Sequence, residues 1–307
     1  MTSTALSIRD AVALCAAWAD RFAKQHGCRA LVIKGSILES QGLRGPHESI
    51  DVDLLVDPAQ FTSFAEALAD AGWHAPKDST DAGIMEKHSA TVSHTHWPIT
   101  IDVHRYFPGF LAEPQTVFET FWERHTTTEI AGVHVNTPNP ASHAALAALH
   151  YLRHPDSGLA LINLPKLIEL TPAALGETGL AELSEIAAAT GSATILAEFL
   201  ADVGAPPAAD APGLESALRQ WELNTHAGST TGWLVKVFRE PIRRWPREIW
   251  YSLVLTDEQI AAHYTMPGES VRSARWRRIR KGLANSPRAL AYLIRFRFTH
   301  RRKRGDA

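Results

Sequence analysis

The sequence predicts an α+β fold, with a mixed β-sheet and its helices in the first half of the chain and an α-helical region in the second. Two observations lead to this expectation. Short apolar runs alternate with amphipathic segments and short turns up to about Pro138. From Asn139 onward, Ala-, Leu- and Glu-rich segments with helical periodicity follow, separated by Pro and Gly. We therefore expect two domains, residues 1–138 and 139–307.

The first half begins with a helix and continues with strands. Apolar residues recur at three- and four-residue steps from Ile8 to Phe22, which predicts an amphipathic helix. The apolar run Ala30–Ile33 predicts a buried strand that enters a tight turn. A second strand is expected over Ser49–Val56, and then a helix over Ala59–Ala71 that Asp57 caps. Further strands are expected at Gly83–Lys87, Ala90–His94 and Pro98–His104.

The second half has the composition and the period of helices. A Pro- and Ala-rich segment, Gly204–Gly213, predicts a loop between the last two of them. The expected helices are Ser142–Arg153, Leu161–Leu170, Leu180–Thr190, Ala193–Ala201 and Leu214–Leu223.

The composition is that of a globular chain. Its 307 residues are 45% apolar and 21% charged, which excludes disorder as the dominant state. No run of about 18 uncharged apolar residues and no N-terminal signal pattern is seen, so we expect no membrane span and a cytoplasmic location. The two cysteines, Cys15 and Cys28, form no CxxC pair, which excludes a disulfide framework and a thiolate metal site.

The charge is distributed unevenly along the chain. The net charge of -2 combines about +12 over residues 270–307 with about -14 over the rest. Basic residues are interleaved with aromatic ones over Trp233–Trp250 and again over Arg272–Arg304. This pattern suits an anionic partner such as RNA, phospholipid headgroups or an acidic peptide. It equally suits a solvated tail that contacts the acidic part of the chain.

Paired carboxylates suggest a metal site. Because side chains alternate along a strand, Asp51 and Asp53 share one face, and Asp102 and His104 share one face of a later strand. If the two strands are neighbours, three carboxylates converge, and such a group suits Mg²⁺ or Mn²⁺. An Asp-x-Asp pair on the wet face of a strand is the plain alternative.

A turn upstream of these carboxylates could bind phosphate. Gly35 and Ser36 follow the first strand, where glycine permits close backbone approach and the serine hydroxyl adds a donor. Lys34 and Arg44 flank the turn and could bind triphosphate oxygens, or they could be ordinary surface charges.

These elements occur in an order that resembles the nucleotidyltransferase superfamily with the DNA polymerase β-like palm. Ile33–Ser36, Gly42–Arg44, Ser49–Val56 and Ile101–His104 are most similar to a largely uncharacterised bacterial branch with a Lys-Gly turn, an Asp-x-Asp strand and an Asp-x-His strand. The resemblance covers about Leu31 to His104.

The resemblance implies a palm-like catalytic domain at 1–138 and a helical accessory domain with a basic tail at 139–307. It implies a Mg²⁺-dependent nucleotidyltransferase that moves a nucleoside monophosphate from an NTP, such as ATP, to a hydroxyl, amine or phosphate of an unidentified acceptor. Asp51 and Asp53 would hold the metal, and Asp102 would be the third carboxylate and would help to deprotonate the acceptor. Lys34, Gly35, Ser36 and Arg44 would bind the nucleotide.

His88 and His104 are expected near the metal, where they could orient a phosphate or the acceptor. His94 and His96 share a strand face, but no cysteine or close acid completes a tetrahedral zinc set. A haloacid-dehalogenase-type phosphatase also begins with Asp-x-Asp, but it has Thr or Val two residues after the second Asp, where this sequence has Leu55. An Asp-x-Asp glycosyltransferase, and a non-catalytic protein that binds a nucleotide or RNA on the same fold, stay as alternatives.

Overall fold

The computed structural model describes residues 6–75, 88–155, 157–226, 242–244, 260, 270–277 and 279–280. The chain divides into two compact units, residues 1–76 with 87–218, and residues 77–86 with 219–307. The described strands all belong to the first unit. The described part of the second unit contains a 3-10 turn at Ile242–Arg244, and helix α8 (Glu215–His226) spans the boundary between the units.

The first unit is built on a four-stranded mixed sheet with strand order β1-β2-β4-β3. Its strands are β1 (Ala30–Ile33), β2 (Asp51–Val56), β3 (Ser89–Ser93) and β4 (Thr100–His104). β2 runs parallel to β4, whereas β1 and β3 are antiparallel to their neighbours. The predicted α+β class with a mixed sheet is therefore confirmed.

A two-stranded sheet and one helix of the first half were not identified from the sequence. They are β5 (Thr126–Ile130) with β6 (Val133–Thr137), and α4 (Pro114–Glu123). The sequence of β5, TTTEI, has one apolar residue, and most of the strand is exposed. It therefore lacks the alternation by which a half-buried strand is recognised.

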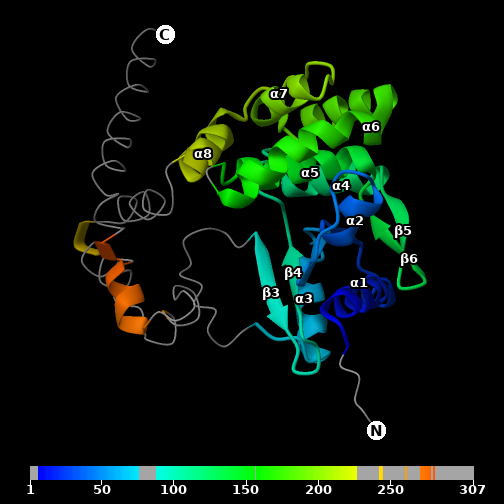
Figure 1. Cartoon of the computed structure of the whole chain (residues 1–307), viewed down its shortest axis with the longest axis vertical. Coiled ribbons are helices and arrows are strands. Elements are labelled where there is room, and N and C mark those ends of the chain that lie inside the picture. The colour runs from blue at the N-terminus through cyan, green and yellow to red at the C-terminus, as the bar shows by residue number, and fades with distance from the viewer. Residues whose placement is uncertain are drawn as a thin grey trace. The chain divides into compact units, whose positions relative to one another are not determined.

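The two faces of the main sheet pack against different helices (Figure 1). On one face, side chains such as Val52 and Leu54 join a core with α1 (Ile8–Gln25) and α3 (Phe61–Asp70). On the other face, Leu31 and Leu55 join a core with α4 and the later helices. This division follows from the two-residue period of a strand.

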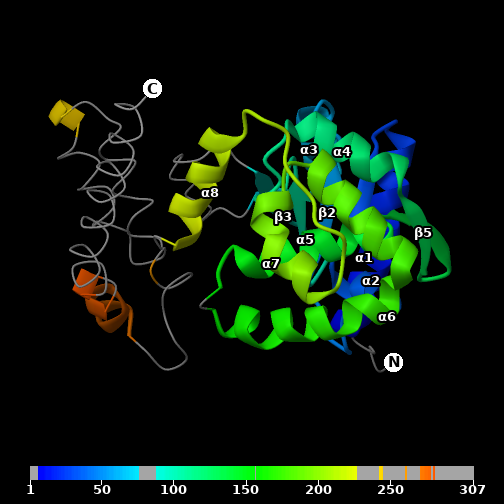
Figure 2. The same cartoon turned by 90° about the horizontal axis from the view of Figure 1, so that it is seen from above.

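The later helices form a layer over the second face (Figure 2). They are α5 (Pro140–Leu152), α6 (Gly158–Ala189) and α7 (Ala193–Asp202). α6 is interrupted at Gly176, whose φ of 62° and ψ of -177° are not helical, so the two helices expected there are joined across a kink. α5 begins three residues after β6 ends, close to the domain boundary predicted at 138, yet α5, α6 and α7 belong to the same compact unit as the sheet.

Helix α6 is long and apolar enough to cross a membrane by length and composition. Only 17% of its most apolar window is buried, and Leu159, Leu161 and Ile162 at its start are exposed. Core helices of soluble proteins pass the same test, so this finding is weak evidence of a membrane span.

The start of α3 differs from the prediction. The helix begins at Phe61 with Gln60 as its N-cap, rather than at Ala59 with Asp57 as its cap. The Asp57 carboxylate accepts from the backbone N–H of Ala59 and from Arg29, so it stabilises a turn before the helix.

Two predicted features lie outside the described residues. They are the strand at 83–87 and most of the two basic and aromatic stretches, including residues 281–304. Cys15 and Cys28 are buried and unpaired with each other, as expected.

Candidate active site

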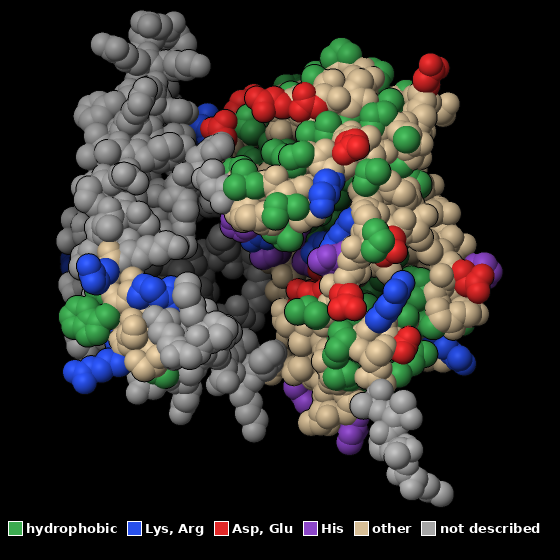
Figure 3. Space-filling view, viewed as in Figure 1, with side chains coloured by type: hydrophobic (Ala, Val, Ile, Leu, Met, Phe, Trp, Pro, Cys, Tyr) green, Lys and Arg blue, Asp and Glu red, His purple; other side chains and the backbone are tan. Residues whose placement is uncertain are grey.

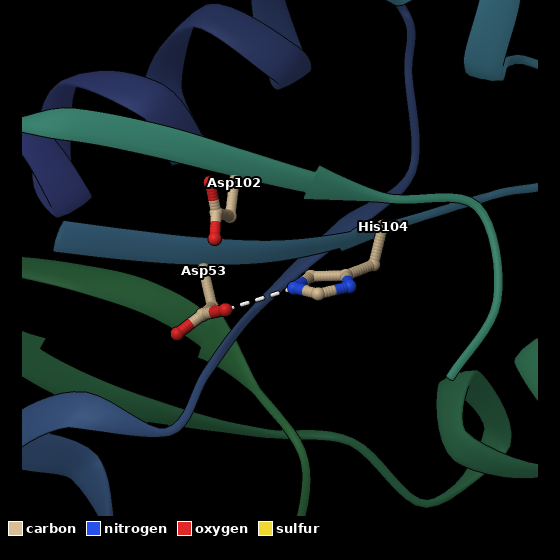
Figure 4. Close-up of side chains that lie close together, drawn as sticks. All are labelled: Asp53, Asp102 and His104. Carbon is tan, nitrogen blue, oxygen red and sulfur yellow. Dashed lines mark hydrogen bonds and ion pairs between the residues drawn. The ribbon is translucent and has the colours of Figure 1, made fainter. Parts of the chain in front are cut away.

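Strands β2 and β4 place acidic side chains next to each other on the face that the later helices cover. β4 lies directly beside β2, and Asp53 is in register with Asp102. This is the strand arrangement on which the predicted cluster depends. Figure 4 shows the carboxylate of Asp102 on the same side of the sheet as Asp53 and the His104 imidazole.

Asp53, Asp102 and His104 form a group of three potential metal ligands. One ligand atom from each lies within 4.8 Å of the others. His104 Nε2 donates to Asp53 Oδ1 over 2.8 Å, because an ionised carboxylate can only accept. Asp53 is 6% exposed and His104 5%, so both lie away from bulk water. His94 and His96 belong to no such group among the described residues.

The donor set of this group fits a divalent cation. Within the described part of the chain, the buried Asp102 Oδ1 and His104 Nδ1 have no hydrogen-bond partner. A buried polar atom without a partner is costly, and a bound ion is one way to satisfy it. Two carboxylates with nitrogen or oxygen neighbours are suitable ligands for Mg²⁺ or Mn²⁺.

Asp51 lies beside this group rather than within it. Its side chain is half-buried, and Ser49 Oγ donates to Asp51 Oδ1 over 3.2 Å. Burial raises the pKa of Asp51, and the negative charges of Asp53 and Asp102 raise it further. Asp51 is thus close enough to the other two carboxylates to be repelled by them, a repulsion that a cation would relieve.

Lys34 contacts the carboxylate group directly. Its Nζ lies 2.6 Å from Asp53 Oδ1 and 5.5 Å from the centre of the Phe107 ring. Burial raises the pKa of Asp53, but the hydrogen bond from His104 and the positive charge of Lys34 outweigh burial and hold this pKa below its usual value. Lys34 therefore helps to keep Asp53 ionised.

The turn after β1 leads into a short helix. α2 (Gly35–Ser40) begins at Gly35, whose φ is 54°, and Ser36 is exposed. Ser36 and Ser49 both line a hollow of about 260 Å³ between α1, α2 and the β5–β6 hairpin. Ser49, which lines this hollow with Ser36, also donates to the carboxylate of Asp51.

Arg44 is half-buried in the loop between α2 and β2. Burial lowers the pKa of its guanidinium group, which the nearby Tyr151 and Glu39 raise in part. Among the described residues, no carboxylate lies within ion-pair distance of Arg44. A half-buried cation without a carboxylate partner is available to bind an anion.

His88 lies next to Arg153, and its ring centre is 6.2 Å from that of His104. Arg153 Nη1 donates to His88 Nε2 over 3.4 Å. Burial lowers the pKa of His88 to about 4, and the charge of Arg153 contributes. His88 is therefore neutral near pH 7.

On the face seen in Figure 3, Lys, Arg and His side chains lie next to Asp and Glu side chains between the helical layer and the lower part of the unit.

Helix α5 supplies site residues that the sequence analysis did not assign. His143 accepts from the backbone N–H of Lys34, with 2.6 Å between Nε2 and N. His150 lies close enough for the charges of Lys34 and Asp53 to affect its pKa, which burial lowers to about 4. The two histidines are seven residues apart, two helical turns, so they share one face of α5. That spacing was the available signal.

A family described as uncharacterised nucleotidyltransferase matches residues 15–201 of the chain. No curated protein matches the chain in sequence. Among solved structures, an antigenic nucleotidyltransferase-like protein from Paracoccidioides brasiliensis is 13% identical, with a TM-score of 0.37, over 68% of this chain and 96% of that chain. The antibiotic-resistance factor ANT(2'')-Ia is 12% identical, with a TM-score of 0.40, over 63% and 97%.

Proposed function

Because the chain belongs to the family of uncharacterised nucleotidyltransferases that matches residues 15–201, we propose that it transfers a nucleoside monophosphate from an NTP to an acceptor, with Mg²⁺ or Mn²⁺ as cofactor. The observation that supports this proposal best is the register of Asp53 with Asp102, beside the Lys34–Ser36 turn. The family match favours this reaction over that of an Asp-x-Asp glycosyltransferase.

The proposed reaction is an in-line displacement at the α-phosphorus of the NTP. An oxygen or nitrogen of the acceptor forms a bond to this phosphorus, and the bond from the phosphorus to the bridging oxygen of the β-phosphate breaks. Pyrophosphate leaves, and the acceptor's proton passes to Asp102. The buried Asp102 Oδ1, which has no partner among the described residues, is the atom we assign to receive it.

The remaining residues hold the reactants and balance charge. Asp51, Asp53 and Asp102 would hold the metal, with His104 next to them. The bound ion would supply a positive charge that lowers the pKa of the acceptor group and neutralises the departing pyrophosphate. Lys34, Gly35, Ser36 and Arg44 would bind the triphosphate, and His88 with Arg153 would orient a phosphate or the acceptor.

The acceptor would be a small molecule, a peptide or RNA that the region 139–307 selects. A cytoplasmic location and an anionic partner for the basic tail belong to the same proposal.

The test is a transfer assay with the full chain. The protein is incubated with each of the four NTPs, labelled on the α- or the γ-phosphate, with Mg²⁺ and fractions of a cell extract as the source of acceptor. We expect label from the α position alone to reach an acceptor. We also expect EDTA to abolish transfer and added Mg²⁺ or Mn²⁺ to restore it.

Each other result contradicts the proposal in a different way. Transfer of the γ label alone would indicate a kinase. Nucleotide binding without transfer of either label would indicate a non-catalytic nucleotide-binding protein. Transfer that persists in EDTA would exclude the metal-dependent mechanism.

A further inference from the structure

The backbone of Lys34 adopts a conformation that a residue with a side chain rarely takes. Its φ is 61° and its ψ is -145°, and Gly35 follows with a φ of 54°. Of the other non-glycine residues that the structure describes, only Ala131, in the β5–β6 turn, has a positive φ. Such a conformation costs free energy and persists only where the surroundings hold it. Something must therefore hold Lys34.

His143 of α5 makes the contact that holds this turn. Its Nε2 accepts from the backbone N–H of Lys34 over 2.6 Å, and its Nδ1 lies 2.8 Å from Gln41 Oε1. Gln41 Nε2 in turn donates to the carbonyl oxygen of Pro138 over 2.8 Å. The Lys34 N–H can only donate, so His143 Nε2 must be the acceptor. In a neutral imidazole Nδ1 then carries the proton, which it donates to Gln41 Oε1.

The position of His143 leaves it little freedom. Its side chain is 0% exposed, and its two ring nitrogens are both used. The Lys34 side chain, which starts from the held backbone, reaches Asp53 Oδ1 at 2.6 Å. A direct path of contacts therefore runs from α5 through the turn to the carboxylate group.

We propose that His143 is a positioning residue, whose neutral Nδ1-protonated imidazole holds the Lys34–Gly35 turn in the conformation that directs Lys34 Nζ to Asp53. The catalytic consequence rests on the proposed nucleotidyl transfer, whereas the effect on the turn does not. α5 is then part of the catalytic unit, although it follows the boundary at residue 138. His143 itself touches neither the carboxylates nor, in this proposal, the reacting atoms.

Three substitutions separate positioning from simple packing. His143→Gln keeps an acceptor that can reach the Lys34 N–H. His143→Asn is shorter, so it can reach Gln41 but not Lys34. Ser142→Ala is the matched control, since Ser142 is also 0% exposed in α5 and its Oγ has no hydrogen-bond partner among the described residues. Circular dichroism checks that each variant folds.

The first measurement is hydrogen exchange of the Lys34 amide in the full chain. We expect exchange to be about tenfold faster in His143→Asn than in the wild type, because this N–H loses its acceptor. Exchange in His143→Gln and Ser142→Ala should stay close to that of the wild type. Nitrogen-15 NMR of the His143 ring should show the proton on Nδ1 in the wild type.

The second measurement is transfer of the α label, resolved into kcat and KM for the NTP. We expect kcat to fall about tenfold in His143→Asn with a smaller change in KM, and His143→Gln to recover most of the loss. Equal impairment in Gln and Asn variants that both fold would overturn the positioning role.

The two measurements fail independently. Unchanged Lys34 exchange in His143→Asn, or a proton on His143 Nε2, overturns the inference whatever the activity is. If the wild type transfers no label, the proposed function fails, while the exchange and NMR results still decide whether His143 holds the turn. If His143→Asn does not fold, the test uses Lys34 exchange in His143→Gln and NMR of the wild-type His143 ring. Slow exchange together with a proton on Nδ1 supports the inference. Any other result contradicts it.

Discussion

The antiparallel pair β1–β2 has an ionic group at each end, and the two groups differ in how fully their polar atoms are paired. At one end, Arg29 donates to both Asp57 and Glu119. Asp57 also accepts from the Ala59 N–H, and Glu119 accepts from Gln115. The Arg29 guanidinium also lies 5.2 Å from the centre of the Phe118 ring. Each carboxylate at this end therefore has several partners.

At the other end, the pairing is incomplete. Lys34 and His104 both contact one oxygen of Asp53. Neither Asp102 Oδ1 nor His104 Nδ1, both buried, has a partner among the residues described. Asp51 lies close enough to the other carboxylates for its pKa to be raised.

The two ends of the β1–β2 pair therefore use their charged side chains for different purposes. A group whose donors and acceptors are all paired within the protein stabilises the fold and has no capacity left for a ligand. A group that leaves ligand atoms unpaired does less for stability but can bind a cation. We therefore expect substitutions at the two ends to separate activity from stability.

The largest expected effect is a loss of activity, at the end of the β1–β2 pair that contains Asp53. Asp53→Ala removes the carboxylate that contacts Lys34 and His104, so transfer of the α label should fall by about 10³-fold or more. The urea midpoint should change less than in Arg29→Met, because the loss of the Lys34 and His104 contacts is offset in part by relief of the repulsion between Asp53 and Asp51. Transfer at the wild-type rate in a folded Asp53→Ala protein would remove Asp53 from the site.

A smaller effect, on stability rather than on activity, is expected at the end of the β1–β2 pair that contains Arg29. Arg29→Met leaves the 3% exposed Asp57 without its cation, so the free energy of unfolding should fall by about 2 kcal/mol. The value is at the low end for a buried pair because Arg29 and Glu119 are partly exposed. Urea denaturation measures it. Loss of label transfer in folded Arg29→Met protein would contradict the separation of the two ends.

The third expected effect is a pH dependence of stability that comes from α5. Burial lowers the pKa of His143 to about 3, below its ordinary 6.5, so the unfolded chain takes up a proton at a higher pH than the folded protein does. This contribution is fully present above pH 6.5 and is lost as the pH falls towards 3. From pH 7 to pH 5 it removes about 2 kcal/mol of unfolding free energy.

His143→Gln isolates this contribution. His88 and His150 also have lowered pKa values and act in the same direction, so the wild type should lose more stability than His143→Gln by about 2 kcal/mol or less over this range. Urea denaturation at both pH values measures the difference. Parallel pH profiles for the two proteins would show that His143 is not buried as a neutral group.

Much of the fold could be predicted because its signals are local. The strand Ala30–Ile33 matches the prediction residue for residue, and α5, α7 and α8 begin and end within three residues of their predicted bounds. The two helices predicted at Leu161–Leu170 and Leu180–Thr190 form one helix, α6, with a kink at Gly176. The β5–β6 hairpin and α4 could not be identified, since β5 has one apolar residue and is stabilised by pairing with β6. Helix α3 begins two residues later than the sequence predicts, because Asp57 stabilises a turn before the helix through the Ala59 N–H and the sequence-distant Arg29.

The sequence by itself determined which side chains share a face. Asp51 lies on the same face of its strand as Asp53, and Asp102 on the same face as His104, because the two-residue period of a strand is a property of the local backbone. Only the tertiary structure decided that β4 lies beside β2 with Asp53 opposite Asp102. It also brought His143 to Lys34, 109 residues away in sequence. Those contacts depend on how distant segments pack together, and no local pattern specifies that packing.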